Sequence, residues 1–191
     1  MKDQLKVVLI SGSSRHPSHT ASLVQAVSTG LSERGAHTCV WILSERRLPA
    51  SDPSYHSDPI LNPDPVVREL VREVADSDAI VLASPVYHNS YSGILKNALD
   101  HLAISQFYRK PVGLVGHGGN RTTQAVDHLR IVVRGLLGFA LSSQVCTCND
   151  DYAETAEVYR IISSDIEARI ERFIDEMMLV AAMMSILRTN T

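Results

Sequence analysis

The sequence predicts a doubly wound α/β domain, in which a five-stranded parallel sheet carries helices on both faces. Five short runs rich in Val, Ile and Leu alternate with five helical patterns along the chain. The runs are almost continuously apolar, which is typical of strands that are covered on both faces. With 191 residues and 45% hydrophobic content, the chain suits one domain with a sizeable core, and we expect residues 1–191 to form that single domain.

The same patterns place each element in chain order. The expected strands are residues 5–10, 36–43, 78–84, 110–116 and 139–147. The expected helices are residues 20–34, 64–76, 91–104 and 121–137, and residues 152–188 are expected to form a long C-terminal helix. Residues 48–65 hold five prolines and are expected to form a loop that serves a site or an interface. The apolar run within residues 175–191 is too short to span a bilayer, so it should pack on the core or form a subunit interface.

The charge balance and the cysteine content narrow the classes of function. Lys and Arg number 18 against 21 Asp and Glu, and the net charge of -3 argues against nucleic acid or an anionic membrane as partner. A small molecule or another protein is the expected partner. The N-terminal residues lack the features of a signal peptide, and three cysteines are too few for a disulfide framework, so we expect a cytoplasmic, reduced protein.

Two of the cysteines, Cys146 and Cys148, lie two residues apart in the last expected strand and should share one of its faces. A metal site would need further ligands at a matching spacing, and the neighbouring sequence offers none. We therefore expect buried strand thiols and no metal.

A polar loop follows the first expected strand and has the composition of an anion site. Residues 10–20, ISGSSRHPSHT, crowd hydroxyls around Arg15 at a turn that feeds a helix, where backbone N–H groups lack partners. Gly12 stands alone and no lysine follows it, which excludes a P-loop and a dinucleotide-binding turn. The loop suits a terminal phosphomonoester. A plain polar turn, with Ser18 or Thr20 capping the helix, is the alternative.

Two further loops should meet the first at the carboxyl edge of the sheet, where ligands of open α/β sheets bind. SPVYHNSYSG, residues 84–93, offers planar side chains at an exposed turn, although Tyr87 could also simply cover the sheet edge. GHGGNRTT, residues 116–123, offers bare backbone that a ring can approach. A phosphate site, a spacer and a flat ring describe a mononucleotide, and flavin mononucleotide (FMN) fits best.

With these three loops the sequence resembles the NAD(P)H-dependent FMN reductases of flavodoxin-like fold, over about residues 5–148. The resemblance implies that FMN is the cofactor, that NADPH or NADH donates hydride, and that no side chain is catalytic. It implies a phosphate site formed by Ser11, Ser13, Arg15, Ser18 and Thr20. It further implies that the ribityl chain and the ring contact Pro85, Val86, Tyr87, His88, Gly116, His117, Gly118 and Gly119. Arg15 and Arg121 are the candidates for contact with a nicotinamide 2′-phosphate.

One helix carries a narrower resemblance. AVDHLRIVVRGLLGF, residues 125–139, is similar to a helix of the two-component flavin reductases that serve sulfonate monooxygenases. In that subgroup an inserted residue opens a π-helical turn at a subunit interface, and His128 matches its position. The resemblance implies a homodimer or homotetramer that supplies reduced FMN to a monooxygenase. An ordinary helical histidine is the alternative for His128.

Two other functions compete with this interpretation. One is a reductase that keeps FMN bound and reduces quinones, azo compounds or metal oxyanions. The other is a flavodoxin-like electron carrier without a nicotinamide site. Flavodoxins tend to be strongly acidic and to flank the flavin ring with aromatic side chains, whereas this chain is mildly acidic and 5% aromatic. The electron carrier is therefore the weakest of the three functional hypotheses.

Overall fold

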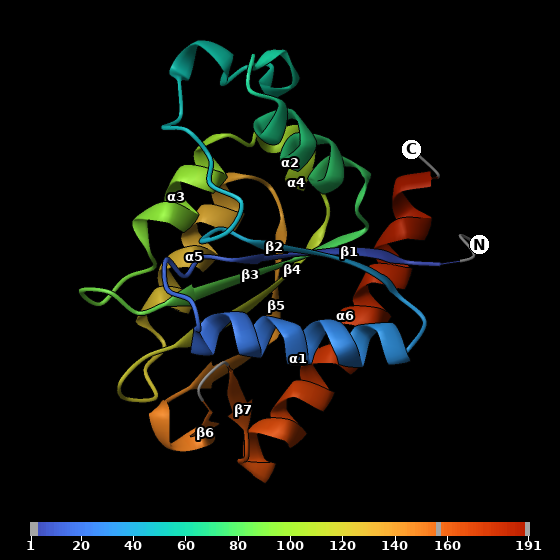
Figure 1. Ribbon diagram of the computed structural model, residues 1–191. Coiled ribbons are helices and arrows are strands. Elements are labelled where there is room, and N and C mark those ends of the chain that lie inside the picture. Colours follow the sequence, from blue (N-terminus) through green and yellow to red (C-terminus); the bar gives the residue numbers. More distant parts are fainter. Residues whose placement is uncertain (1–3, 156–157, 190–191) are drawn as a thin grey trace.

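A computed structural model describes residues 4–155 and 158–189 of the protein (Figure 1). Five parallel strands form one sheet in the order β2-β1-β3-β4-β5, as the sequence predicts. The strands are β1 (Lys6–Ser11), β2 (His37–Ile42), β3 (Ala79–Pro85), β4 (Pro111–His117) and β5 (Phe139–Thr147). The chain runs outward from β1 to β2 and then crosses to β3, so the strand order reverses between β1 and β3. Ligands of such sheets bind at this point of reversal.

Helices cover both faces of the sheet (Figure 1). The main helices are α1 (His19–Glu33), α2 (Pro65–Asp76), α3 (Gly93–Asp100), α5 (Gln124–Gly135) and α6 (Ser164–Thr189). Successive residues of β1 point to opposite faces, so that Val7 and Leu9 pack with α1 and α6 while Val8 and Ile10 pack with the other helices. The two apolar cores therefore sit on either side of one buried sheet.

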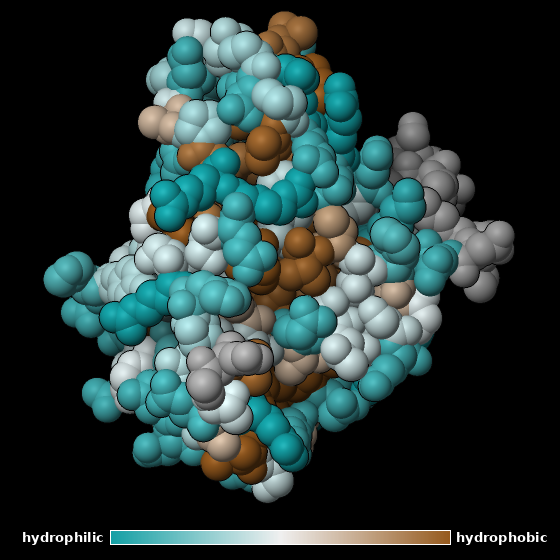
Figure 2. All heavy atoms as spheres, viewed as in Figure 1, coloured by the Kyte–Doolittle hydropathy of each residue, from teal (hydrophilic) through white to brown (hydrophobic). Residues whose placement is uncertain are grey.

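The edge of the sheet at β2 is less well covered. Cys39, Val40 and Ile42 are only partly buried. Figure 2 shows apolar surface at the level of this edge, between α1 and the helices on the opposite face.

The C-terminal helix is shorter than predicted, because it begins at Ser164 and not at residue 152. Residues 149–151 form a short turn, η3 (Asn149–Asp151), and two strands follow, β6 (Tyr152–Glu154) and β7 (Tyr159–Ile161), which pair as an antiparallel hairpin. The β-branched and aromatic residues around Tyr159 favour a strand. Two serines followed by Asp165 and Glu167 in the first helical turn are a typical helix start.

The first half of α6 packs on the core. A Cβ atom on Gly113 of β4 would lie 2.3 Å from Phe173 and 2.6 Å from Met177, so this strand position needs glycine for α6 to approach. The second half of α6 leaves Leu179, Met183 and other apolar side chains exposed. Within the described part of the chain, no helix is long and apolar enough to cross a membrane.

Two other regions depart from the expected boundaries. The helix expected at 91–104 ends at Asp100, and a separate turn, α4 (Ile104–Phe107), begins where the Ala103 N–H donates to the Gln106 side chain. The proline-rich loop carries two short turns, η1 (Pro53–Tyr55) and η2 (Pro59–Leu61). It is tied to α3 because the Asn97 side chain donates to the Pro49 carbonyl at 2.8 Å.

The two neighbouring cysteines do not share a strand face. Cys146 is buried in β5, where burial raises the pKa of its thiol to about 11. Cys148 lies beyond the end of β5 and is half-buried. The expectation of a buried strand thiol is therefore right for Cys146 and wrong for Cys148.

Candidate functional site

The three polar loops meet at the carboxyl edge of the sheet, next to the reversal between β1 and β3. The Gly12 N–H donates to the Ala83 carbonyl at 2.8 Å, and Ser92 Oγ donates to the Gly12 carbonyl at 2.5 Å. A Cβ atom on Gly12 would lie 2.6 Å from the Leu95 Cβ, so glycine is required for this contact. The second and third loops join where the Val86 N–H donates to the His117 carbonyl at 2.7 Å.

The first loop presents hydrogen-bond donors that no other described residue uses. The buried Ser11 hydroxyl has no hydrogen-bond partner among the described residues. Within the described ranges, six backbone N–H groups of this loop also have no partner, those of Ser13, Ser14, His16, Ser18, His19 and Thr20. Ser18 Oγ accepts from the Ala21 N–H at 3.3 Å and caps α1, whose positive end therefore points into the loop. We call residues 11–20 the donor loop.

The other hydroxyls of the donor loop are held in place. Ser13 Oγ accepts from the Arg15 N–H at 3.2 Å, and Thr20 is buried in the first turn of α1. The Arg15 side chain is exposed and makes no ion pair with any residue that the structure describes.

The second loop is a tight turn at the end of β3. Pro85 is buried and Val86 half-buried, whereas Tyr87 and His88 are exposed. His88 and Asn89 have φ angles of 48° and 61°, a left-handed conformation that His and Asn adopt more readily than most residues. Tyr87 and Ser90 close the turn with two backbone hydrogen bonds of 2.9 and 3.0 Å. The turn therefore leaves the rings of Tyr87 and His88 exposed next to the site.

The third loop is mostly bare backbone. Gly116 and Gly118 are buried, and the exposed Gly119 has open space where a side chain would be. A Cβ atom on Gly118 would lie 3.0 Å from the Asn120 carbonyl oxygen and 3.3 Å from the Val86 Cβ, which leaves room for little besides glycine. A planar ligand could lie directly against this backbone.

Four rings gather beside the third loop. His19 stacks on His117, with ring centroids 4.1 Å apart and planes at 6°, and on Tyr159, with centroids 3.6 Å apart and planes at 19°. Tyr152 meets the edges of both histidine rings, 4.8 Å from His19 and 5.5 Å from His117. The stack joins the start of α1, the end of β4 and the hairpin.

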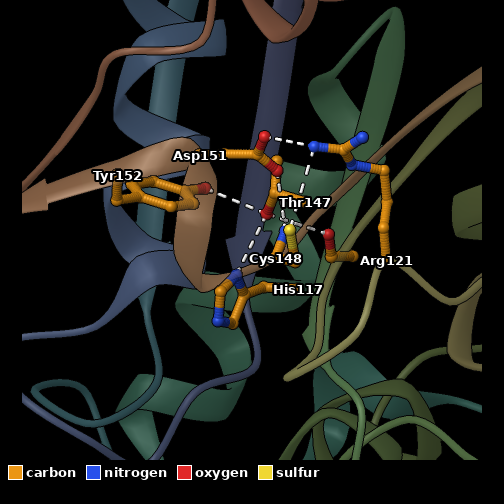
Figure 3. A network of polar contacts seen from close by, with 7 residues as sticks. His117, Arg121, Thr147, Cys148, Asp151 and Tyr152 are labelled. Carbon is orange, nitrogen blue, oxygen red and sulfur yellow. Dashed lines mark hydrogen bonds and ion pairs between the residues drawn. The ribbon is translucent and has the colours of Figure 1, made fainter.

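A polar network supports this stack from the end of β5 (Figure 3). His117 Nδ1 lies 3.1 Å from Thr147 Oγ1, which lies 3.0 Å from the Tyr152 hydroxyl. Arg121 forms an ion pair with the buried carboxylate of Asp151 (Figure 3). The pair uses Nη2 of the Arg121 guanidinium, and the contact of Arg121 with a 2′-phosphate stays a prediction.

The surroundings of the stack disfavour the charged form of both histidines, because they lower the pKa of each ring. Burial and the nearby His19 lower the pKa of His117 to about 4. Burial also lowers the pKa of His19, where Glu154 opposes the shift and Arg15 adds to it. Burial by itself would raise the pKa of Asp151, but the Cys148 N–H and Arg121 outweigh it and hold that pKa below its usual value.

His128 lies at the edge of this site, but the predicted π-helical turn is not there. Residues 124–135 form one α-helix, so its backbone shows no inserted residue at His128. His128 is exposed, and its Nδ1 lies 2.9 Å from Ser90 Oγ in the second loop. The residue touches a site loop, and its role at a subunit interface stays a prediction.

The sequence does not predict several of the residues at this site. His19 stands inside the first loop, yet nothing in the sequence distinguishes it from its neighbours. Tyr152 and Tyr159 fell within the helix that was expected from residue 152. The β-branched and aromatic residues from Val158 to Ile162 are the signal that could have identified the second strand of their hairpin.

A comparison with protein families identifies the chain. The family model described as NADPH-dependent FMN reductase matches residues 5–151. The chain belongs to this family. As an FMN reductase it is an oxidoreductase that uses FMN and NAD(P)H. The matched segment holds all three loops and ends before the hairpin.

Curated relatives agree with the family. The FMN-dependent NADPH-azoreductase of Staphylococcus aureus (strain USA300) is 34% identical to this FMN reductase over 174 residues, which cover 90% of this chain and 93% of the relative.

Solved structures show the flavodoxin-like fold that the resemblance implies. An oxidoreductase from Corynebacterium diphtheriae has a TM-score of 0.71 at 22% identity, covering 95% of this FMN reductase and 98% of that chain. The flavoenzyme FerB of Paracoccus denitrificans, an NAD(P)H:(acceptor) oxidoreductase, has a TM-score of 0.71 at 19% identity, with 95% and 97% covered. A flavodoxin from the domain Archaea has a TM-score of 0.62 at 12% identity, with 92% and 99% covered.

Proposed function

We propose that this protein binds FMN where the three loops meet and transfers hydride to it from NAD(P)H. The observation that carries the proposal is the set of donors in the donor loop that no described residue uses, six backbone N–H groups and the Ser11 hydroxyl. A buried hydroxyl without a partner costs stability unless a ligand satisfies it. Unpaired N–H groups at the positive end of a helix suit a phosphate, so these residues fit the phosphate end of FMN.

The side chains of the donor loop can complete this phosphate site. Ser13 Oγ and Ser18 Oγ each accept a hydrogen bond from the backbone, and a hydroxyl that accepts can still donate. Arg15 supplies a positive charge on the solvent side. Ser11 and Thr20 complete the proposed set at the ends of β1 and α1.

The other two loops suit the ribityl chain and the flat ring. We assign Pro85, Val86, Tyr87 and His88 to one side of the flavin, and Gly116, His117, Gly118 and Gly119 to the other. Held by these residues, FMN would supply the redox chemistry between the nicotinamide and an electron acceptor. The protein residues need only bind and orient the two rings, because no side chain has to take up or release a proton. Burial lowers the pKa of His117 to about 4, which favours its neutral form at this position.

Replacing Arg15 tests the phosphate site directly. We expect Arg15→Ala to weaken FMN binding by about 1.5–3 kcal/mol, the usual cost of losing a hydrogen bond to a charged group. Riboflavin lacks the phosphate, so its affinity should stay unchanged. Flavin fluorescence titration measures both affinities. Arg72→Ala, which removes an exposed arginine on α2, is the matched control. An unchanged FMN affinity in Arg15→Ala, or an equal loss for riboflavin, would remove Arg15 from the phosphate site.

Two acceptors compete for the electrons. The similarity of residues 125–139 to two-component flavin reductases supports release of reduced FMN to a monooxygenase. The name of the Staphylococcus aureus relative supports a second candidate, in which FMN stays bound and reduces an azo compound. The regular α-helix around His128 removes one argument for the first candidate.

The dependence of the rate on FMN separates these two candidates. Flavin-stripped protein is mixed with NADPH or NADH, and FMN is added from far below to far above the protein concentration. Saturation only at a large excess of FMN supports a reductase that releases its flavin. Saturation at one FMN per chain, with turnover that requires an azo dye or a quinone, supports the bound cofactor.

We also propose that the protein works in the cytoplasm as a homodimer or homotetramer. Four exposed apolar side chains on α6 support an assembly of this kind, namely Leu179, Met183, Ile186 and Leu187.

A further inference from the structure

The hairpin β6–β7 lies outside the segment that matches the family, yet it reaches the candidate site. The family match ends at Asp151, and the hairpin begins at the next residue. Its two strands pair Tyr152 with Ile161 and Glu154 with Tyr159. The pairing brings both tyrosines to the site, although seven positions separate them in the chain.

The two tyrosines hold His19 from different directions. Tyr159 covers the flat face of the imidazole, with ring centroids 3.6 Å apart. Tyr152 meets the ring at its edge, with planes at 76°, and its hydroxyl lies 3.5 Å from the His19 carbonyl oxygen. The Tyr159 hydroxyl in turn donates to Glu154 Oε1 at 3.3 Å, across the hairpin. His19 is therefore fixed by ring contacts and by a contact to its backbone.

His19 touches both ends of the proposed flavin site. Its backbone N–H is one of the unused donors of the donor loop, at the phosphate end. Its imidazole stacks on His117, which we assign to the ring end, with planes at 6°. A side chain that fixes His19 consequently acts on both ends of the site.

We propose that Tyr159 is a positioning residue for flavin binding, acting through His19 on the donor loop and on His117. The proposal rests on the function proposed above, because it takes the three loops as the flavin site. It adds a residue that lies beyond the family-matched segment. The Tyr159 ring stacks on His19 and meets Tyr152, and no ring contact joins it to His117, so its effect on His117 should pass through the His19 ring.

The titration of His117 reports on the stack without any flavin. Three charged groups bear on the two histidines: Arg15 and Glu154 act on His19, and Asp151 acts on His117. Burial is the main cause of the low His117 pKa of about 4. Removing the Tyr159 ring leaves these charges in place and exposes the stack to water, so the pKa of His117 should rise towards its ordinary value.

The experiment compares Tyr159→Leu, Tyr159→Phe and wild-type protein, all free of flavin. NMR titration of the imidazole resonances should show the His117 pKa rising by about one pH unit in Tyr159→Leu. Tyr159→Phe keeps the ring and should behave as wild type. FMN binding, measured by fluorescence, should weaken roughly two- to tenfold in Tyr159→Leu, the range expected from losing one aromatic pair. Tyr108→Leu removes an exposed tyrosine next to α4 and is the matched control. It should change neither the His117 pKa nor the FMN affinity.

An unchanged His117 titration in a folded Tyr159→Leu would overturn the proposal. If that variant does not fold, wild-type protein still decides, because the stack requires nuclear Overhauser contacts between the Tyr159 and His19 ring protons, and their absence would overturn it as well. Failure of the proposed function looks different. In that case Arg15→Ala would leave FMN affinity unchanged, while the Tyr159→Leu titration would still report the stack.

Discussion

His117, at the end of β4, combines a polar ring with surroundings that do not tolerate its charge. The His19 ring covers one of its faces, and the Thr147 hydroxyl lies 3.1 Å from Nδ1. A proton on His117 would place a charge in a partly buried stack next to a second imidazole. The structure therefore favours the neutral ring, and this preference links folding to pH.

The low pKa of His117 predicts that acid lowers the free energy of unfolding. The folded protein binds this proton only below about pH 4, whereas an unfolded chain binds it below the ordinary value of 6.5. Between these values the unfolded state holds more protons, so stability is present above pH 6.5 and falls as the pH drops towards 4. Water reaches part of the ring, so we expect His117→Asn to reduce the loss of unfolding free energy between about pH 7 and about pH 4.5 by about 1–2 kcal/mol.

Urea unfolding at the two pH values measures this loss. His56→Asn is the control, because His56 is exposed in the loop between η1 and η2 and its replacement should leave the pH dependence of wild type. Equal pH dependence in wild type and His117→Asn would show that the imidazole is not held neutral by the fold.

Among the elements, those set by local periodicity could be predicted from the sequence. The five strands lie close to their expected positions, because a buried parallel strand needs a continuous apolar run bounded by turn residues. The meeting of the three loops could be predicted for the same reason, since the carboxyl ends of parallel strands share one edge. Ser11, Gly12 and Gly118 lie at that edge because each stands at or just after the end of β1 or β4.

The parts that could not be predicted depend on contacts between distant residues. His19 and Tyr159 are far apart in the chain, and only the pairing of β6 with β7 brings the second ring over the first. Arg121 is engaged by Asp151 through the turn after β5, which no local pattern indicates. The π-helical turn at His128 was expected from a resemblance, and the backbone there follows a regular α-helix.

For the whole molecule, the fold by itself does not choose between enzyme and electron carrier. An oxidoreductase and a flavodoxin both superpose on this chain, with TM-scores of 0.71 and 0.62. One sheet with the same strand order can serve either function, so the argument for a reductase rests on the family and on the loops. The hairpin and the whole of α6 lie outside the family-matched segment.

The exposed end of α6 predicts self-association. Leu179, Met183, Ile186 and Leu187 recur at intervals of four, three and one residues, which places them along one side of the helix, and each is at least 50% exposed. A two-fold contact would bury the same side chains from both copies, and each buried Leu or Met contributes about 1.5–3 kcal/mol. Leu179→Lys combined with Met183→Lys should therefore turn a dimer into a monomer, or a tetramer into a smaller species, in sedimentation velocity. Leu61→Lys, at an apolar side chain of η2 that is 66% exposed, should leave the assembly of wild type intact because it lies outside this stripe. The prediction is wrong if wild-type protein sediments as a monomer, or if the double variant keeps the wild-type assembly.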